Sequence, residues 1–310
     1  MEISFLIPTR NRPENLKRNL LSLSKLNIRN LHFEIIVIDD CSDLSYDEVL
    51  LEFKDIQYYK NSTSMGISYV RNKLAQLAKG EYLIFLDDDV LISENTSINL
   101  IYDLFEKDNT LGLISFNISA HINNNKFSSE SLFVIKQIPF KKYQLFFNPE
   151  LENEVNYVSY FIGAAFACRK DIFNNKIIFD ELFFWGNEEI DFSYNIIQNN
   201  LKILYHPECK ADHYPAQSVI GEESQQFNSF ILFISNRILT AYKNLPVIYF
   251  ISYVFIWTVY YFLISLKTFR ILDWIKGINL GISKIKKSSR NPLGKIGIEY
   301  LKNNYGRILF

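Results

Sequence analysis

The chain has 310 residues, of which 48% are hydrophobic, so it can build one large α/β core plus an additional segment. Its net charge is −1, and its three cysteines (Cys41, Cys168 and Cys209) form no CxxC pair, which excludes a disulfide scaffold and favours a reducing compartment. An apolar strand begins almost at the first residue, with no basic segment before it, so we expect no signal peptide.

The first half of the chain alternates predicted strands and helices. Apolar runs predict strands at residues 3–7, 34–38, 56–59, 82–86 and 112–116. Helical spacing of apolar residues predicts helices after Pro13, over 67–78 and over about 93–105. This βαβα order predicts a mostly parallel sheet flanked by helices, with right-handed crossovers.

The second half is less regular. Residues 121–156 have weak periodicity and many polar side chains, which predicts a long loop region. Residues 157–169 have strand character, 188–198 a helical pattern and 202–205 that of a short strand. We place an α/β domain over residues 1–230 and a helical region over 231–310.

The helical region begins with an apolar stretch and ends with a basic one. Residues 245–266 carry no charge, and residues 267–310 contain ten Lys or Arg and two Asp or Glu. Twenty-two uncharged residues can cross a ~30 Å hydrocarbon core, but a single span would export the basic tail against the positive-inside rule. We therefore favour a re-entrant or interfacial helix pair at the cytoplasmic face of a membrane, with residues 271–276 continuing along the surface.

One alternative is a buried helix that packs on the α/β domain or on a second copy of the chain. The apolar stretch beside the basic tail favours a phospholipid surface over nucleic acid as the anionic partner.

Three consecutive aspartates follow the predicted strand at 82–86 and are the most informative feature of the chain. Asp87, Asp88 and Asp89 would lie at the carboxyl end of a central strand, where open α/β sheets bind ligands. Three adjacent carboxylates repel one another, and a divalent cation among them makes the arrangement favourable. A solvated acidic turn is the alternative.

The turn after the first strand excludes two common nucleotide sites. Its sequence, Pro8 to Arg12, contains no glycine, so it is not the G-x-G-x-x-G turn of a dinucleotide-binding fold. No G-x-x-x-x-G-K-S/T motif is present in the chain. We therefore expect a metal to bind the phosphates of any nucleotide.

Two further positions fit a nucleotide ligand. The second strand ends in Asp39 and Asp40, and a carboxylate there can accept a hydrogen bond from the N3–H of uracil or thymine. We assign this contact to Asp39 and favour a turn-capping role for Asp40. Arg71, near the start of a predicted helix, can reach a diphosphate or a carboxylate, although a surface arginine is the common alternative.

The second half of the chain supplies a further acidic cluster. Glu188, Glu189 and Asp191 follow Trp185 at a predicted helix N-terminus, where acidic residues are ordinary dipole partners. Their functional interpretation is a general base for an incoming hydroxyl. His213 is a possible nitrogen ligand for a metal bound to aspartate, although a lone histidine usually has no such role.

Taken in order, these motifs resemble those of family 2 glycosyltransferases with the GT-A fold. The resemblance covers about residues 1–230 and is carried by Phe5–Arg12, Val37–Ser42, Gly66–Asn72, Phe85–Asp89 and Trp185–Asp191. It implies a nucleotide-binding role for Pro8, Thr9, Arg12, Asp39, Arg71, Asp87 and Asp88. It implies metal binding by Asp89, Asp87 and His213, and a sugar or acceptor pocket at Gly163, Ala164, Trp185 and Asp191. The catalytic carboxylate would be Glu189, with Glu188 as the neighbouring candidate.

The resemblance implies an inverting transfer from a nucleoside-diphosphate sugar to a saccharide or lipid-linked saccharide. Mg²⁺ or Mn²⁺ would be the cofactor. Two alternatives are a non-catalytic module that binds a sugar nucleotide and a nucleotidyltransferase. The acidic motifs disfavour the first, and the missing glycine-rich loop disfavours the second.

Overall fold

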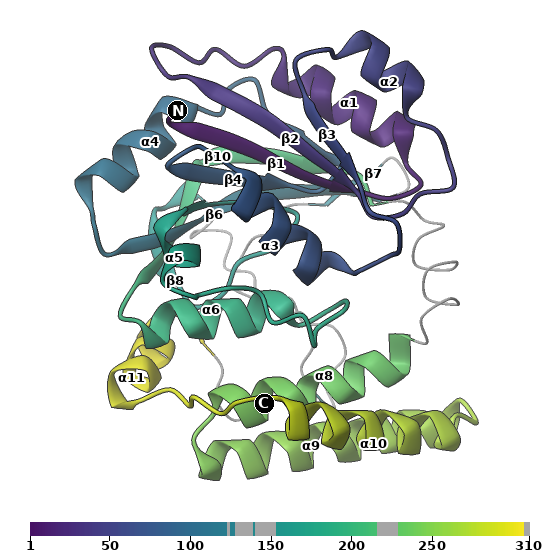
Figure 1. Cartoon of the computed structure of the whole chain (residues 1–310). Coiled ribbons are helices and arrows are strands. Elements are labelled where there is room, and N and C mark those ends of the chain that lie inside the picture. The colour runs from purple at the N-terminus through teal and green to yellow at the C-terminus, as the bar shows by residue number, and fades with distance from the viewer. Residues whose placement is uncertain (123–124, 128–138, 140–152, 216–228, 307–310) are drawn as a thin grey trace.

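Figure 1 shows the computed structural model of the chain, which describes residues 1–122, 125–127, 139, 153–215 and 229–306. A twisted central sheet has helices on both faces, and a layer of helices from the last part of the chain lies below it. The strands are β1 (Ile3–Thr9), β2 (Phe33–Asp39), β3 (Gln57–Lys60), β4 (Tyr82–Leu86), β5 (Val90–Ile92), β6 (Leu111–Ile122), β7 (Asn125–Phe127), β8 (Asn156–Val158), β9 (Ala165–Arg169) and β10 (Lys202–His213). The helices are α1 (Pro13–Leu23), α2 (Asp47–Glu52), α3 (Ile67–Leu77), α4 (Ile98–Lys107), α5 (Asp171–Asn174), α6 (Glu188–Gln198), α8 (Ser229–Asn244), α9 (Val247–Lys267), α10 (Ile271–Lys287) and α11 (Lys295–Asn303).

The sheet is mixed, with strand order β3-β2-β1-β4-β9-β6-β10-β5. Strands β3, β2, β1 and β4 are parallel neighbours, as the alternation of strands and helices predicts. The expectation of a mostly parallel sheet is wrong for the second half. There β9 is antiparallel to both β4 and β6, and β10 is parallel to β6 but antiparallel to β5 and β8.

Alternate residues of the central strands face two separate cores. Leu6 and Phe85 belong to the core under α3 and α6, whereas Phe5 and Ile84 belong to the core under α1 and α4. Both faces are buried, which explains why these strands read as continuous apolar runs in the sequence. Their carboxyl ends then meet at one edge of the sheet, where β1 and β4 lie side by side.

Two element boundaries differ from the sequence expectations. Helix α4 begins at Ile98, where the Oγ of Ser97 accepts a hydrogen bond from the Leu100 amide, and not at 93. Strand β10 continues to His213 beyond the expected end at 205. It does so across a bulge at 206–210 that contains Pro207, which has no amide hydrogen for the ladder.

The expected loop over 121–156 is replaced at its ends by strands. β6 continues to Ile122 and pairs with β7, and β8 begins at Asn156. Residues 123–124, 128–138 and 140–152 lie outside the described part of the chain. The strand character of 157–169 is confined to the end of β8 and to β9.

The helices α8, α9 and α10 form the layer below the sheet in Figure 1. Phe230, Ile238, Trp257 and Leu301 from this region belong to the same core cluster as the sheet residues that face α3 and α6. The hydrophobic core therefore includes residues on both sides of position 230, and the division into regions 1–230 and 231–310 stays a prediction.

Helix α9 is, among the described helices, the one whose length and apolar composition suffice to cross a membrane. Its 18-residue apolar window has a mean hydropathy of 2.0 and is 17% buried. Tyr253, Trp257 and Tyr261 pack inward, while Ile251 and Phe255 are 60% and 67% exposed. Within this chain, helix α9 is thus covered on one face only. A helix buried on the α/β domain alone does not match this, and contact with a second copy stays a prediction.

Candidate active site

A cavity of about 370 Å³ opens where the carboxyl ends of β1 and β4 meet the N-termini of α3 and α6. Its polar lining comes from five separate parts of the first 190 residues, and α8 adds a further wall. The lining residues that carry side-chain chemistry are Thr9, Arg10, Arg12, Asp40, Ser64, Arg71, Asp87, Trp185, Glu188, Glu189 and Phe233. The sheet edge that the sequence identified therefore lines a cavity and is not merely a solvated turn.

Arg71 is the centre of the buried charges in this cavity. Its Nη2 atom donates to Asp87 Oδ1 at 3.3 Å and to the carbonyl oxygen of Gly163 at 3.0 Å, and its Nη1 donates to Glu188 Oε1 at 3.3 Å. The residue is 2% exposed. Arg71 thus joins the aspartates after β4 to the acidic start of α6, and it is not a surface arginine.

Gly163 makes room for this contact. A Cβ atom at this position would lie 2.7 Å from Arg71 Nη2 and 2.7 Å from Glu189 Oε1, closer than atoms can approach. The next residue, Ala164, accepts a hydrogen bond from the Asp87 amide at 2.9 Å. Both residues were expected in the sugar pocket, and the structure places them behind the charged groups, outside the cavity lining.

Two glutamates at the start of α6 face the cavity and differ in environment. Burial raises the pKa of Glu188 to about 8, and the negative charge of Glu189 adds to the effect. Burial also raises the pKa of Glu189, which Arg71 opposes. Glu188 is 4% exposed, whereas Glu189 is only partly buried, so Glu189 is the more accessible carboxylate.

The turn before α6 directs these side chains. Gly186 and Asn187 both have left-handed backbone, with φ of 83° and 70°. Glycine adopts that conformation without strain, and asparagine tolerates it better than most residues. Trp185, just before them, is 42% exposed and packs against Phe233 of α8 with ring centroids 5.5 Å apart. The turn therefore brings an aromatic wall next to the two glutamates.

The two aspartates at the end of β2 lie in different surroundings. Asp39 is fully buried, and its oxygens accept from the Ser42 amide at 2.8 Å and from the Tyr58 hydroxyl at 2.8 Å. Asp40 lines the cavity, where it also accepts from the amide of Gly66 at 3.0 Å. The side chain that can meet a ligand at this position is therefore Asp40.

The three aspartates after β4 diverge. Asp87 lines the cavity. Asp88 is fully buried and accepts from Thr9 Oγ1 at 2.6 Å and pairs with Arg12 Nη2 at 3.0 Å, so it supports the turn after β1 and does not line the cavity. Burial raises the pKa of Asp88 to about 7.

Asp89 turns toward the end of β10. Its Oδ1 lies 3.3 Å from His213 Nε2, and its Oδ2 lies 2.8 Å from Arg12 Nη1. The two residues meet because β5 pairs with β10, which sets His213 opposite Val90. Burial raises the pKa of Asp89, but the His213 and Arg12 contacts outweigh it and lower the pKa below its usual value.

These residues offer two donors for a divalent cation. Within the described part of the chain, no three His, Cys, Asp or Glu side chains gather as a metal site. Mg²⁺ commonly binds through one or two carboxylates plus substrate phosphates and water. An ionised Asp89 beside the His213 imidazole fits that requirement, so the donor set is compatible with such a cation.

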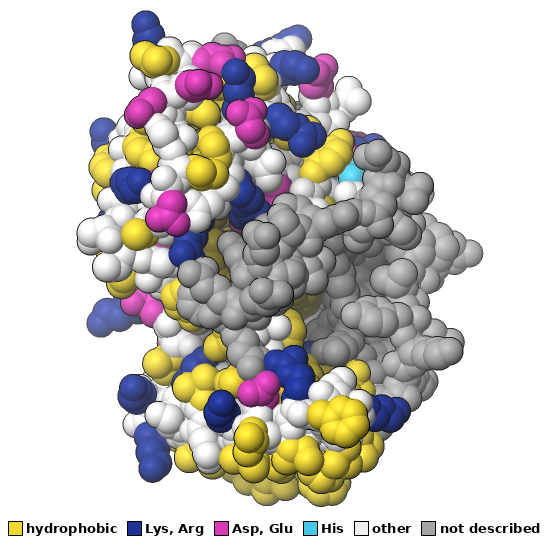
Figure 2. All heavy atoms as spheres, turned by 90° about the vertical axis from the view of Figure 1, so that its right-hand side faces the viewer, with side chains coloured by type: hydrophobic (Ala, Val, Ile, Leu, Met, Phe, Trp, Pro, Cys, Tyr) yellow, Lys and Arg dark blue, Asp and Glu magenta, His cyan; other side chains and the backbone are white. Residues whose placement is uncertain are grey.

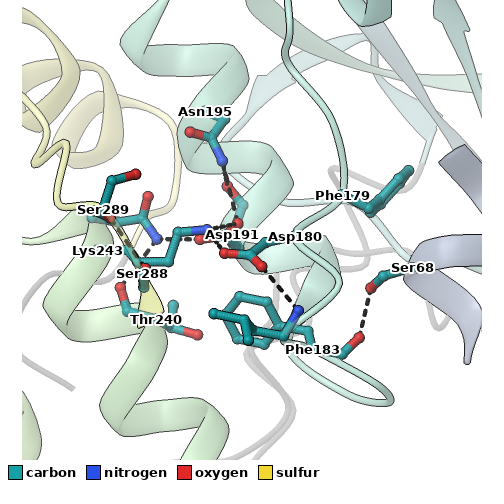
Figure 3. Close-up of polar contacts among 12 residues, drawn as sticks. Ser68, Phe179, Asp180, Phe183, Asp191, Asn195, Thr240, Lys243, Ser288 and Ser289 are labelled. Atoms are coloured by element: carbon teal, nitrogen blue, oxygen red, sulfur yellow. Dashed lines mark hydrogen bonds and ion pairs between the residues drawn. The ribbon is translucent and has the colours of Figure 1, made fainter. Parts of the chain in front are cut away.

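Asp191 was expected in the acceptor pocket, and the structure places it elsewhere. Its fully buried carboxylate accepts from Lys243 Nζ at 2.8 Å and from Asn244 Nδ2 at 2.6 Å, as Figure 3 shows for Lys243. Lys243 also contacts Asp180 at 2.5 Å. Asp191 therefore ties α6 to α8 and lies outside the cavity lining.

The sequence matches the model of glycosyl transferase family 2 over residues 4–177. The chain belongs to this family. Its cavity is the candidate active site of this family 2 glycosyl transferase domain.

Relatives match this glycosyltransferase over its N-terminal part. An uncharacterized glycosyltransferase of Haemophilus influenzae is 32% identical over 115 residues, which are 32% of this chain and 37% of the relative. The poly(ribitol-phosphate) beta-N-acetylglucosaminyltransferase TarS of Staphylococcus aureus is 29% identical over 106 residues, or 31% of this chain and 18% of TarS. The alignments thus span about a third or less of these relatives' own lengths.

Solved structures confirm the fold of the glycosyltransferase. S. aureus TarS 1-349 has a TM-score of 0.59 at 17% identity, over 92% of this chain and 82% of that one. The same fragment in complex with UDP-GlcNAc has a TM-score of 0.59 at 19% identity, over 82% and 70% of the two chains. GalNAc-T7 with UDP, GalNAc and Mn²⁺ has a TM-score of 0.57 at 22% identity, over 69% and 44%.

Several residues of this glycosyltransferase site were not identified from the sequence. Arg10, Ser64 and Phe233 line the cavity, and Lys243 supports α6. Arg10 lies inside the motif Phe5–Arg12, which was the sequence signal for it. Phe233 and Lys243 lie on α8, whose contact with α6 has no signal in the sequence.

Proposed function

We propose that this glycosyltransferase moves a sugar from a nucleoside-diphosphate sugar to a hydroxyl of a saccharide, free or lipid-linked, with inversion at the anomeric carbon. The observation that carries the proposal is the Arg71 cluster, in which Asp87 and Glu188 meet one guanidinium on the wall of a single cavity. The complexes of TarS with UDP and UDP-GlcNAc support a nucleotide sugar as the donor.

The donor fits the side of the cavity formed by the turn after β1. Pro8, Thr9 and Arg12 line it, as expected, and Arg10 adds a second cationic side chain for a diphosphate. The base contact first assigned to Asp39 moves to Asp40, whose carboxylate reaches the cavity wall. A uracil N3–H would then donate to Asp40.

Glu189 is the proposed general base. The acceptor oxygen forms a bond to the anomeric carbon while the bond to the diphosphate breaks, and the hydroxyl proton passes to Glu189. Because burial raises the pKa of Glu188 to about 8, one carboxyl of the pair keeps its proton at neutral pH. The more accessible Glu189 is left to act as the base.

A divalent cation held by Asp89 and His213 would supply positive charge to the leaving diphosphate. Asp87, which pairs with Arg71 on the cavity wall, would lie near the sugar-bearing end of the donor. The Mn²⁺ in the GalNAc-T7 structure supports Mn²⁺ or Mg²⁺ as the cation.

A panel of UDP-, GDP- and dTDP-sugars tests the proposal. Purified full-length protein is incubated with each donor and with saccharide acceptors, with Mn²⁺ or after chelation, and free nucleoside diphosphate is measured. We expect one donor class to be consumed in a Glu189-dependent reaction. Release of nucleoside monophosphate, or no consumption of any donor, would contradict the proposal.

The lower face of the molecule supports attachment to a membrane surface. Figure 2 shows hydrophobic side chains gathered at the end where α9 and α10 lie in Figure 1, with lysine and arginine side chains above them. Ile248, Phe255 and Leu272 are 74%, 67% and 73% exposed there. This pattern is typical of helices that lie in the interface of anionic membranes.

Two observations favour an interfacial helix pair over a single span. Helix α10 folds back against α8 and does not continue away from α9, since Gly277 and Gly281 abut Ile234 and Ile238. The basic residues of the last helices then stay on the same side as the catalytic cavity. We accordingly place the protein on the cytoplasmic face, where a lipid-linked saccharide would be within reach of the cavity.

A further inference from the structure

A buried asparagine on α8 holds the turn that precedes the catalytic glutamates. Asn236 is fully buried, and its Nδ2 donates to the carbonyl oxygens of Trp185 at 2.9 Å and of Gly186 at 2.7 Å. Both donor hydrogens of one side chain are therefore used on two consecutive carbonyls. This contact fixes the turn from outside the α/β domain.

A lysine on α10 fixes the asparagine in turn. Lys284, which is 8% exposed, donates from Nζ to Asn236 Oδ1 at 2.6 Å. The bond orients the amide, because an oxygen that faces the ammonium directs the NH₂ group toward the turn. Burial lowers the pKa of Lys284 to about 8, which means that burying the charged ammonium costs free energy in the folded state.

This contact requires α10 to pack closely against α8. The sequence of α10 allows this packing. Gly277, Gly281 and Lys284 follow one another at helical spacing on the face toward α8. A Cβ atom at Gly277 or Gly281 would come within 2.9 Å of Ile234 or Ile238. The two glycines let the backbones come close enough for Lys284 to reach Asn236.

The turn controls the acceptor side of the cavity. Trp185 forms part of its wall, and the left-handed residues Gly186 and Asn187 connect that wall to Glu188 and Glu189. A shift of the turn would move the aromatic wall and the base together. We expect a smaller effect on the donor side, where Arg12 and Asp40 come from the turns after β1 and β2.

We propose that Asn236 and Lys284 are positioning residues for the acceptor, which hold the Trp185–Gly186 turn so that an acceptor hydroxyl meets Glu189. The inference rests on the proposed function, because it specifies the acceptor half of the same site. It also links this half to α10, whose outer side chain Ile282 is 46% exposed on the apolar face.

Three variants test the proposal. Asn236→Asp keeps the acceptor for Lys284 but replaces the donating amide with an oxygen that faces two carbonyls. Lys284→Met removes the ammonium and keeps most of the side-chain length. Lys286→Met, on an exposed position of the same helix, is the matched control for the loss of a positive charge.

We expect kcat/KM for the acceptor to fall about 10- to 100-fold in Asn236→Asp and Lys284→Met, since small displacements of reacting groups have effects of that size. The dissociation constant for the nucleoside diphosphate should stay within about twofold of wild type, and Lys286→Met should match wild type in both measurements. Acceptor kinetics equal to wild type in both variants would overturn the proposal. So would parallel losses of donor binding, acceptor transfer and thermal stability, which indicate a structural role alone.

A readout that does not depend on transfer separates this proposal from the proposed function. Acrylamide quenching of Trp185 fluorescence, obtained as the difference from a Trp185→Phe variant, should increase in Asn236→Asp. If wild type transfers no sugar, the proposed function fails while this increase still reports release of the turn. If quenching is unchanged, Asn236 does not hold the turn, and the positioning proposal fails by itself.

Discussion

Arg71 Nη1 lies 3.3 Å from Glu188 Oε1, across 117 positions of sequence. The contact joins α3 to the start of α6, and the other terminal nitrogen of Arg71 reaches Asp87 at the end of β4. One guanidinium therefore sets the distance between the aspartate side of the cavity and its glutamate side. The roles of the two glutamates follow from their positions relative to it.

Replacement of Glu189 by Gln should reduce turnover by ~10²–10⁴ with little change in donor affinity, because a general base acts in the transition state. Steady-state transfer kinetics and calorimetric binding of the nucleoside diphosphate give the two quantities. Glu188→Gln is the matched control, because it makes the same chemical change at the neighbouring position. If Glu188→Gln alone shows the large loss, the base is Glu188, and if neither does, the catalytic carboxylate lies elsewhere.

The raised pKa of Glu188 predicts a pH-dependent stability. Between its ordinary value of 4.5 and its folded value of about 8, the unfolded chain releases the proton that the folded chain retains. Rising pH therefore favours unfolding over this range, and the loss is complete above about pH 8. Gln does not titrate, so Glu188→Gln should leave Tm nearly unchanged at pH 4.5 and raise it relative to wild type at pH 8.5.

The expected difference at pH 8.5 is at least ~2 °C, because one unit of pKa shift corresponds to about 1.4 kcal/mol and a chain of this size changes by about 2–4 °C per kcal/mol. Thermal unfolding of both proteins across this pH range measures it. A Tm difference that is constant with pH would show that Glu188 ionises normally in the folded protein.

Asp89→Asn should abolish the dependence of nucleoside diphosphate binding on Mn²⁺ or Mg²⁺, since an amide is a much poorer ligand than a carboxylate for these cations. His213→Ala should weaken the same dependence less, because it leaves the carboxylate. Titration calorimetry with and without the cation tests both. Full activity of Asp89→Asn, or of wild type in EDTA, would sink the metal assignment.

Lys243→Met should destabilise the protein by about 3–5 kcal/mol, because it leaves the buried Asp191 and its neighbour Asp180 without their shared cation. Burial raises the pKa of Asp191, and the positive charge of Lys243 lowers it. Without Lys243, only the effect of burial would remain from this pair. Denaturant unfolding measures the change. Lys202→Met, which removes a partly exposed lysine 3.9 Å from Asp108, is the control and should change stability by less than about 1 kcal/mol.

The parallel half of the sheet could be predicted because each of its central strands is apolar on both faces. The antiparallel insertion of β9 could not be predicted, since its partner residues lie 51 or more positions away. An apolar run also does not indicate whether a strand will pair parallel or antiparallel. The same limit applies to Asp191, whose partner Lys243 is 52 residues along the chain.

The site shows a second kind of limit. Sequence order identified the carboxylates of the cavity, but it could not decide between adjacent ones. Neighbouring residues at a strand end point to opposite faces, so a choice between Asp39 and Asp40 depends on which face the cavity occupies. In the structure, Gly66 and Ser64 lie against Asp40, which lines the cavity, and this placement is why we propose Asp40 for the base contact.

Phe255→Asp and Leu272→Asp should each weaken binding of the protein to anionic lipid vesicles. Both side chains are exposed on the apolar face of α9 and α10, and a carboxylate there opposes insertion into the interface and is repelled by negative headgroups. Flotation with vesicles that contain phosphatidylglycerol measures the bound fraction, which we expect to fall at least about fivefold for each variant, since the loss of an apolar contact alone is worth ~1 kcal/mol or more.

Leu51→Asp is the matched control, because Leu51 is 72% exposed, close to the 73% of Leu272, but lies on α2. This helix is at the opposite end of the molecule from α9 and α10 in Figure 1, so Leu51→Asp should bind vesicles like wild type. Neither membrane variant replaces a core side chain, and transfer to a short soluble saccharide should therefore persist while transfer to a lipid-linked one falls. If wild type does not float with the vesicles, or if all three variants bind equally, the apolar face serves another contact and the membrane proposal is wrong.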